Sequence, residues 1–191
     1  LVEAMRVIKG ENYQLFNKSC EDLTDIPDES VDCITISSPY FQQRDYPDGV
    51  RDLGQPQHGM EKTVDEFVNK EVDIHRQSYR KLRKTGSLFM VLSDSYEGQE
   101  SCLVIEKLCI GMKNSGWHLN QKIHWWKDNP KPQSVQAKRL QPCVEYLLHW
   151  VKDPEAFYYR EFKIWKENGK YDVGRGSKDC GFGHKMKTHT W

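Results

Sequence analysis

The chain has 191 residues, of which 37% are hydrophobic, 12% aromatic and 29% charged. This length and composition fit one globular domain, and no apolar run approaches the roughly 20 residues of a membrane-spanning helix. The formal net charge is zero, but residues 1–74 carry 7 basic and 16 acidic side chains, whereas residues 75–191 carry 21 and 12. Such a division predicts that one half meets an anion, and nucleic acid is the obvious candidate.

The first predicted elements alternate with loops. Residues 12–17 predict a short strand, and the β-branched apolar run 31–36 predicts a buried strand. Residues 41–60 form a polar loop that is long enough to suggest a function. Thr63, with Glu66 three residues later, predicts the start of a helix by a capping box, and we expect Gly86 to end that helix.

The second half of the chain continues the alternation, with strands predicted at 87–92, 117–127, 143–151 and 157–165, a helix at 101–114 and a loop at 167–191. This order predicts an α/β sheet that is parallel at first and antiparallel at its end. Ligands of such sheets bind at the carboxyl ends of strands. Asp94 lies at one such end, and we expect it to cap the following turn rather than to touch substrate.

Cysteine and histidine give little sign of a metal site. The six cysteines form no CxxC pair and mostly lie in apolar runs, so we expect free, buried thiols. Cys180, His184 and His189 lack a fourth ligand, and we therefore expect no zinc. His58 and His75 are interpreted as surface residues. One tryptophan of the pair at 125 and 126 is expected in the core, because neighbours on a strand face opposite sides.

The segment Ser37-Ser38-Pro39-Tyr40 follows the strand at 31–36 and could hold an exocyclic amino group. The Ser37 hydroxyl and the Ser38 carbonyl can each accept one N–H bond, while the Tyr40 ring can stack on the attached base. Such bonds would direct the nitrogen lone pair at an electrophile. The alternative is a strand that ends in a serine-proline turn, and these four residues alone leave both interpretations open.

The run Asp32 to Tyr40 resembles motif IV of the amino-methylating DNA methyltransferases, (Ser/Asp/Asn)-Pro-Pro-(Tyr/Phe). The resemblance covers about residues 12–165 and includes Arg44-Asp45-Tyr46, the stretch 79–96 and the stretch 123–146. It implies a Rossmann-like class I methyltransferase sheet, circularly permuted in the beta arrangement. It also implies S-adenosyl-L-methionine as cofactor, double-stranded DNA as substrate, and Ser37, Ser38, Pro39 and Tyr40 as catalytic residues. The leading serine favours cytosine N4 over adenine N6 as the target.

Contacts to DNA are expected from two regions. Arg44 and Tyr46 lie in the loop after the motif, next to the expected pocket. The second region surrounds the prolines at 130 and 132 and contributes basic side chains for phosphate contacts, with a solvated basic surface as the alternative. Trp126 could wall the pocket of a flipped base. The predicted DNA-binding residues are Arg44, Tyr46, Trp126, Lys127, Lys131, Lys138 and Arg139.

Three departures from the family pattern matter. Ser38 occupies the position of the first proline, which keeps the carbonyl but lowers local rigidity. Lys18 occupies the position where relatives use an acid to contact the cofactor adenine, so that role is not carried over. The sequence also contains no Phe-x-Gly-x-Gly cofactor loop after a strand. We therefore expect only the catalytic half of the domain, with the cofactor-binding residues unknown.

The expected organisation has three parts: residues 1–4 as an expression remnant, 5–165 as the catalytic part, and 166–191 as the start of a target-recognition region or a linker. The cofactor half would lie in a missing C-terminal part or in a companion chain. We expect a cytoplasmic, nucleoid-associated enzyme of a restriction-modification or epigenetic system, if the source is prokaryotic or a phage. The alternatives are a non-catalytic DNA-binding remnant and a methyltransferase that acts on RNA or on protein glutamine.

Overall fold

The computed structural model describes residues 7–45, 57–130, 132–134 and 136–160, and the backbone of 163–165 and 171–173. The predicted residues Tyr46, Lys131, Cys180, His184 and His189 lie outside this part. The chain divides into two compact units, Leu1–Tyr158 and Tyr159–Trp191. The expected functional division at residue 165 stays a prediction.

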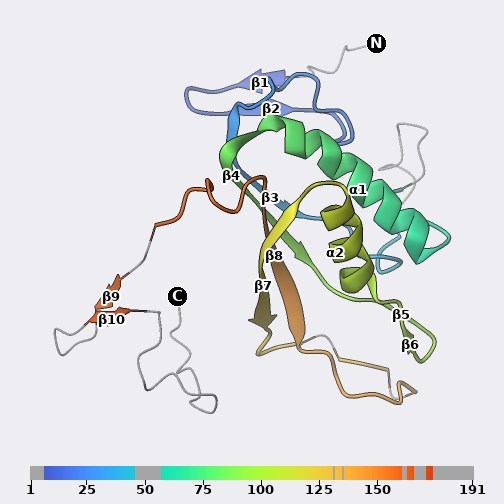
Figure 1. Ribbon diagram of the computed structural model, residues 1–191. Helices are drawn as coiled ribbons and strands as arrows, with labels where there is room; N and C mark the ends of the chain where they lie inside the picture. Colours follow the sequence, from blue (N-terminus) through green and yellow to red (C-terminus); the bar gives the residue numbers. More distant parts are fainter. Residues whose placement is uncertain are drawn as a thin grey trace, which may run out of the picture. The chain divides into compact units, whose positions relative to one another are not determined.

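The first unit is built on a four-stranded mixed sheet (Figure 1). Its strands are β3 (Val31–Ser37), β4 (Leu82–Leu92), β7 (His118–Trp126) and β8 (Val144–Val151), in the order β3-β4-β8-β7. β3 and β4 are parallel, and β8 runs antiparallel to both of its neighbours. The predicted α/β class, with a parallel start and an antiparallel end, is confirmed. The pattern did not predict that β8 lies between β4 and β7.

The remaining strands are short. β1 (Val7–Lys9) pairs with β2 (Gln14–Phe16), and β5 (Tyr96–Glu97) pairs with β6 (Glu100–Ser101). In the second unit, β9 (Lys163–Trp165) pairs with β10 (Tyr171–Val173), which was expected to be loop. The strand predicted from Phe157 is wrong for residues 157–160, because the Phe157 N–H donates to the Asp153 carbonyl in a turn.

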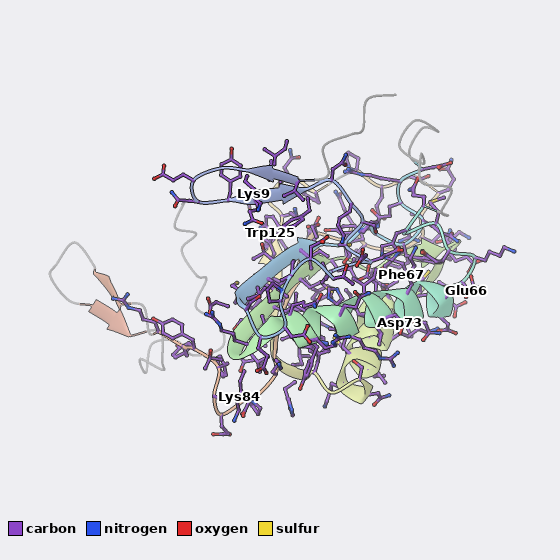
Figure 2. All side chains as sticks on the ribbon, turned by 90° about the horizontal axis from the view of Figure 1, so that it is seen from above. Lys9, Glu66, Phe67, Asp73, Lys84 and Trp125 are labelled. Carbon is purple, nitrogen blue, oxygen red and sulfur yellow. The ribbon has the colours of Figure 1, made fainter. Side chains whose placement is uncertain are left out.

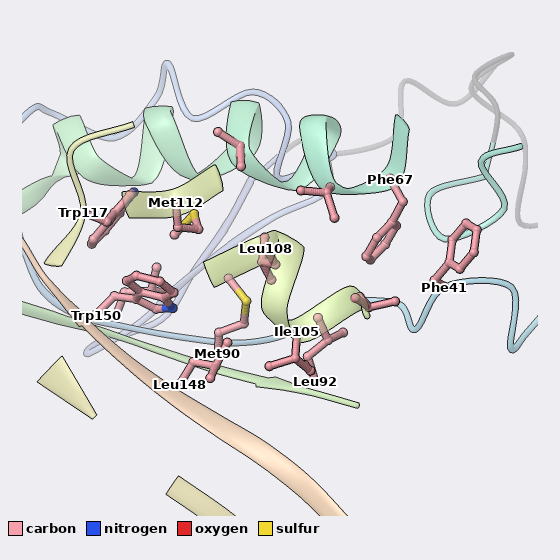
Figure 3. Packing of buried hydrophobic residues seen from close by; sticks show 14 of the residues in the cluster. Phe41, Phe67, Met90, Leu92, Ile105, Leu108, Met112, Trp117, Leu148 and Trp150 are labelled. Carbon is pink, nitrogen blue, oxygen red and sulfur yellow. The ribbon is translucent and has the colours of Figure 1, made fainter. Parts of the chain in front are cut away.

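Helices α1 (Val64–Lys81) and α2 (Val104–Asn114) pack together on one face of the sheet (Figures 1 and 3). Every second residue of β4 and β8 points toward the helices. Burying each such apolar side chain stabilises the fold by about 1.5–3 kcal/mol. On α1, Phe67 is buried while Glu66 and Asp73 are exposed (Figure 2). Neither described helix is long and apolar enough to cross a membrane. The fully buried hydrophobic side chains of the two central strands are Leu82, Leu88, Met90, Leu92, Leu148, Trp150 and Val151.

The predicted start of α1 is confirmed, but the predicted end is wrong. The Thr63 hydroxyl accepts a hydrogen bond from the Glu66 N–H at 3.1 Å. The helix ends at Lys81, because the following residue already adopts the extended conformation of β4. Gly86 lies inside β4, where a Cβ would approach the Asp32 carbonyl oxygen to 2.9 Å. Glycine is therefore required there by the close approach of β3 to β4.

The run 31–36 was expected to be a buried strand, and this is wrong. Among the described residues β3 has one sheet partner, β4, so it is an edge strand with no fully buried residue. The expected burial of the cysteines is wrong for Cys33 in this strand and for Cys20 before it, since both are exposed. The five described cysteines are free, as predicted.

Candidate active site

The motif lies where two parallel strands end. β3 ends at Ser37 and β4 ends at Leu92, and the parallel register brings both carboxyl ends to the same edge of the sheet. A cleft of about 450 Å³ opens at this edge, and we call it the terminal cleft. It is lined by residues from both strand ends and from the proline-rich segment, among them Tyr40, Asp94, Lys127, Arg139 and Glu145.

Tyr40 is held in the wall of the terminal cleft by Glu145. Its hydroxyl donates to Oε2 of Glu145 at 3.0 Å, and the Lys127 ammonium lies 3.1 Å from the same oxygen. Burial and the adjacent Glu145 carboxylate raise the pKa of Tyr40 to about 12, so the phenol stays neutral at ordinary pH. Sequence reasoning included Glu145 only in the resemblance and missed this role, because 105 residues separate it from Tyr40.

The first three motif residues, Ser37, Ser38 and Pro39, line a second cavity. This cavity, of about 600 Å³, is mostly apolar and lies along β3 and α1; we call it the β3 groove. Ser37 is exposed, whereas Ser38 is only 2% exposed and its hydroxyl donates to Oε2 of Glu71 at 2.9 Å. The motif therefore borders both cavities, with Tyr40 in the terminal cleft.

Glu71 is the centre of a buried polar network that the sequence did not predict. It is 1% exposed, and its Oε1 lies 2.5 Å from Nε2 of His58. The other ring nitrogen of His58 lies 3.0 Å from Oε1 of Glu61. His75 Nε2 is 3.3 Å from Oε2 of Glu71 without forming a well-aligned hydrogen bond. The expectation that both histidines lie on the surface is wrong, because His75 is fully buried and the side chain of His58 is only 15% exposed.

The network shifts the pKa values of its members. Burial alone would raise the pKa of Glu71, but the hydrogen bond from His58 and the nearby His75 lower it to about 2. Burial alone would lower the pKa of His58, but the Glu71 and Glu61 carboxylates outweigh it and raise the value. Glu71 is therefore a carboxylate and His58 is inclined to carry a proton, so that the two form an ion pair.

Asp94 has the structural role that the sequence predicted. Its Oδ1 accepts hydrogen bonds from the N–H groups of Ser95 at 2.9 Å and Val104 at 2.8 Å. Its Oδ2 accepts a bond from the Ser101 hydroxyl. Val104 is the first residue of α2, so Asp94 satisfies a main-chain donor at the start of that helix.

The described DNA-binding candidates occupy different settings. Arg44 and Lys138 are exposed, while the guanidinium of Arg139 lies 3.8 Å from the Tyr96 ring centroid and donates to the Gly98 carbonyl. Trp126 is 63% exposed.

The expectation that one tryptophan of β7 is in the core is wrong. Trp125 is 50% exposed and Trp126 63%, so both tryptophans lie largely in solvent. They stand at the end of a strand at the sheet edge, where the last three residues are all exposed. Neither ring lines the terminal cleft.

Comparison with known proteins places this arrangement in a family. The chain is 28% identical over 168 residues to the type II methyltransferase M.SfiI of Streptomyces fimbriatus, covering 78% of this chain and 38% of that protein. The PvuII DNA methyltransferase, described as cytosine-N4-specific, superposes with a TM-score of 0.52 at 17% identity, over 66% of this chain and 44% of the other. TTHA0409 of Thermus thermophilus, solved in complex with S-adenosyl-L-methionine, gives a TM-score of 0.50 at 18% identity, over 71% and 50%.

The fold and the site together define an α/β protein with a Ser-Ser-Pro-Tyr motif at the carboxyl end of a parallel strand. The family model of the DNA methylases matches residues 31–189, and the chain belongs to that family. It spans half or less of the length of the three relatives compared above.

Proposed function

We propose that this chain is the catalytic part of an S-adenosyl-L-methionine-dependent DNA methyltransferase whose target is the N4 amino group of cytosine. The observation that carries the proposal is the placement of Tyr40, the last residue of the Ser-Ser-Pro-Tyr motif, in the terminal cleft, where Glu145 fixes it. The descriptions of the PvuII enzyme and of the TTHA0409 complex support the cytosine target and the cofactor, respectively.

The motif residues would act by holding a flipped base. The base would enter from the terminal cleft and stack on Tyr40. It would reach the Ser37 hydroxyl and the Ser38 carbonyl where the motif passes from this cleft to the β3 groove, and these two oxygens would accept its two amino hydrogens. The amino nitrogen is itself the nucleophile, so no cysteine is needed as a covalent intermediate. Most of the rate would come from positioning. A neutral Tyr40 also keeps a second negative charge away from Glu145.

The cofactor, when bound, supplies a methyl group activated on a sulfonium sulfur. Lys18, at the position where relatives use an acid to contact the adenine, is paired with Asp22 at 2.8 Å and with Asp25 at 2.5 Å and has no oxygen to accept a hydrogen bond from it. We propose that residues of a further C-terminal part or of a companion chain hold most of the cofactor. Residues 5–165 would form the catalytic part and 166–191 the approach to target recognition.

The predicted basic and aromatic residues, including Tyr46 and Lys131, would bind double-stranded DNA. Among the described cations predicted to bind DNA, Arg44 and Lys138 are exposed, whereas Lys127 and Arg139 are partly buried. Lys127 is shared between Glu145 and the Trp125 ring, with its nitrogen 3.8 Å from the ring centroid. We therefore assign phosphate contacts first to Arg44 and Lys138, and assign Lys127 and Arg139 to shaping the cleft.

The test is methyl transfer by the complete enzyme that contains this chain. Ser37→Ala removes one acceptor for the amino group, and we expect kcat to fall by about tenfold with a smaller change in DNA affinity. Ser19→Ala, in an exposed loop, serves as the control. Mass spectrometry of the nucleosides distinguishes N4-methylcytosine from N6-methyladenine. Full turnover by the Ser37→Ala enzyme would exclude the assigned role.

A second candidate is a DNA-binding part without catalysis, and the pairing of Lys18 within its own loop favours it. Calorimetry with S-adenosyl-L-methionine separates the two candidates. Binding by the complete protein supports the enzyme, and its absence, with and without any companion chain, supports the binding module.

A further inference from the structure

The segment 57–61 folds back onto the catalytic motif. The Gln42 N–H donates to the Gly59 carbonyl at 2.6 Å. Gly59 has a φ of +92°, and a Cβ there would lie 2.9 Å from Cβ of Pro39. The main chain of this segment is thus packed against the motif, and only glycine combines this conformation with this close approach.

The same segment reaches the motif a second time through α1. His58 contacts Oε1 of Glu71, and Oε2 of Glu71 accepts the Ser38 hydroxyl. The His58 ring also stacks on Phe67, with 5.3 Å between centroids and 17° between planes. Phe41 packs against Phe67 from the motif side, with a centroid distance of 5.6 Å. Ser38 is therefore tied to α1 and to the segment 57–61 by side chains that lie almost entirely inside the protein.

This arrangement bears on the position where the family pattern has proline. A proline ring would fix φ of residue 38 covalently, and serine leaves that dihedral free. The Ser38 side chain, however, is anchored to a buried carboxylate, and a charge-assisted hydrogen bond is both stronger and more directional than a neutral one. A buried carboxylate destabilises the fold unless it is paired, and His58 supplies the opposite charge.

We propose that Glu71 and His58 are positioning residues that fix the Ser38 carbonyl and thereby replace the rigidity of the absent proline ring. Neither residue touches the substrate. Their effect passes through Ser38 to the amino group of the flipped base, so the inference rests on the proposed methyltransferase function. Loss of this network should lower the rate of methyl transfer and leave substrate binding intact.

The kinetic test uses the complete enzyme. Glu71→Gln keeps the shape of the side chain but removes its charge, and we expect kcat to fall by about tenfold with KM for DNA unchanged. The same substitution is then made in the Ser38→Pro enzyme, and its kcat is compared with that of the Ser38→Pro enzyme alone. There the proline ring fixes residue 38, so Glu71→Gln should lower kcat by a much smaller factor. Ser78→Ala is the matched control, because Ser78 is a buried serine of α1 that lines the same groove, and among the described residues its hydroxyl donates to the Ile74 carbonyl of its own helix.

A second measurement does not depend on methyl transfer. Titration of the His58 ring by NMR should show a pKa above 6.5 in the wild type and a lower pKa in Glu71→Gln. The charged or titratable groups around this pair are Glu61, Lys70, His75 and Cys20.

The outcomes separate the two claims. A wild type that shows the raised His58 pKa but methylates no DNA would overturn the proposed function and leave the network intact. Equal losses of kcat from Glu71→Gln with serine and with proline at residue 38 would overturn the positioning role, as would an unchanged kcat with serine. Smaller losses in the proline background, together with a lowered His58 pKa, would support it.

Discussion

Two carboxylates from different elements hold the two ends of the motif. Glu71 of α1 accepts the Ser38 hydroxyl, and Glu145 of β8 accepts the Tyr40 hydroxyl. One carboxylate is buried and paired with His58, while the other is shared with Lys127 at the rim of a cleft. The two ends thus have different environments, which allows the Ser38 end to be rigid while the Tyr40 end meets solvent and ligand.

The ion pair of Glu71 and His58 makes stability depend on pH in two directions. The pKa of Glu71 is lowered from 4.5 to about 2, so its contribution is complete above 4.5 and is lost as the pH falls toward 2. The pKa of His58 is raised, so its contribution is complete below 6.5 and is lost as the pH rises through the higher folded value. We expect Glu71→Gln to remove both pH-dependent contributions and to lower the free energy of unfolding by about 3 kcal/mol at pH values where both are complete.

Urea denaturation at a series of pH values measures this effect. Asp73→Asn, on the exposed side of α1, is the control and should keep the wild-type profile within about 0.5 kcal/mol. If Glu71→Gln had the same pH profile as the wild type, Glu71 and His58 would not be an ion pair in the folded protein.

At the scale of elements, Gly86 decides how closely β3 and β4 can approach. A Cβ at this position would lie 2.7 Å from Cγ of Leu82 and 2.9 Å from the Asp32 carbonyl oxygen. The main-chain contact cannot be relieved by a rotamer change. We therefore expect Gly86→Ala to lower the free energy of unfolding by about 1–3 kcal/mol, measured by urea denaturation.

Thr85→Ala provides the comparison, because Thr85 is the exposed neighbour in the same strand. Thr85→Ala should lower the free energy of unfolding by no more than the roughly 1 kcal/mol that separates strand propensities. Equal stability of the two variants would show that the strands adjust to an added methyl group and that the close approach is not required.

The positions of the elements could be read from the sequence because they depend on neighbouring residues. The Thr63 cap and the apolar runs of β4 and β8 are local patterns, and each is found where it was predicted. The neighbours of a strand are not local. Nothing within β3 shows that it has one partner, and nothing within residues 117–127 shows that β8 separates that strand from β4.

The candidate site shows the same limit. Ser37 to Tyr40 could be identified because the motif is continuous in sequence. Glu71 and Glu145 could not be assigned their contacts, because they meet the motif across 33 and 105 residues. His58 was interpreted as a surface residue since its partner lies in a helix that begins after the loop.

For the whole molecule, the division between an acidic part, residues 1–74, and a basic part, residues 75–191, predicts which residues would bind DNA. The acidic part contains the motif, and the basic part contains the proline-rich segment beside the terminal cleft. Lys138→Ala should weaken DNA binding of the complete enzyme across all sequences and reduce the slope of log affinity against log salt by about one.

Lys113→Ala is the matched control, because Lys113 is an exposed lysine at the end of α2. Its slope should equal that of the wild type in the same fluorescence anisotropy titrations. Equal slopes for both variants would mean that Lys138 faces solvent in the complex.

The position of β8 has a consequence for the order in which the molecule is made. Within the described part of the chain, β7 pairs only with β8, and β8 also occupies the second edge of β4. When the chain up to residue 143 has left the ribosome, β3, β4, β7 and both helices are free to fold, but β7 has no strand to join. The eight residues of β8, Val144–Val151, join β7 to β4, and they are synthesised after both of these strands. We therefore expect β7 to join the sheet only after β8 has been made.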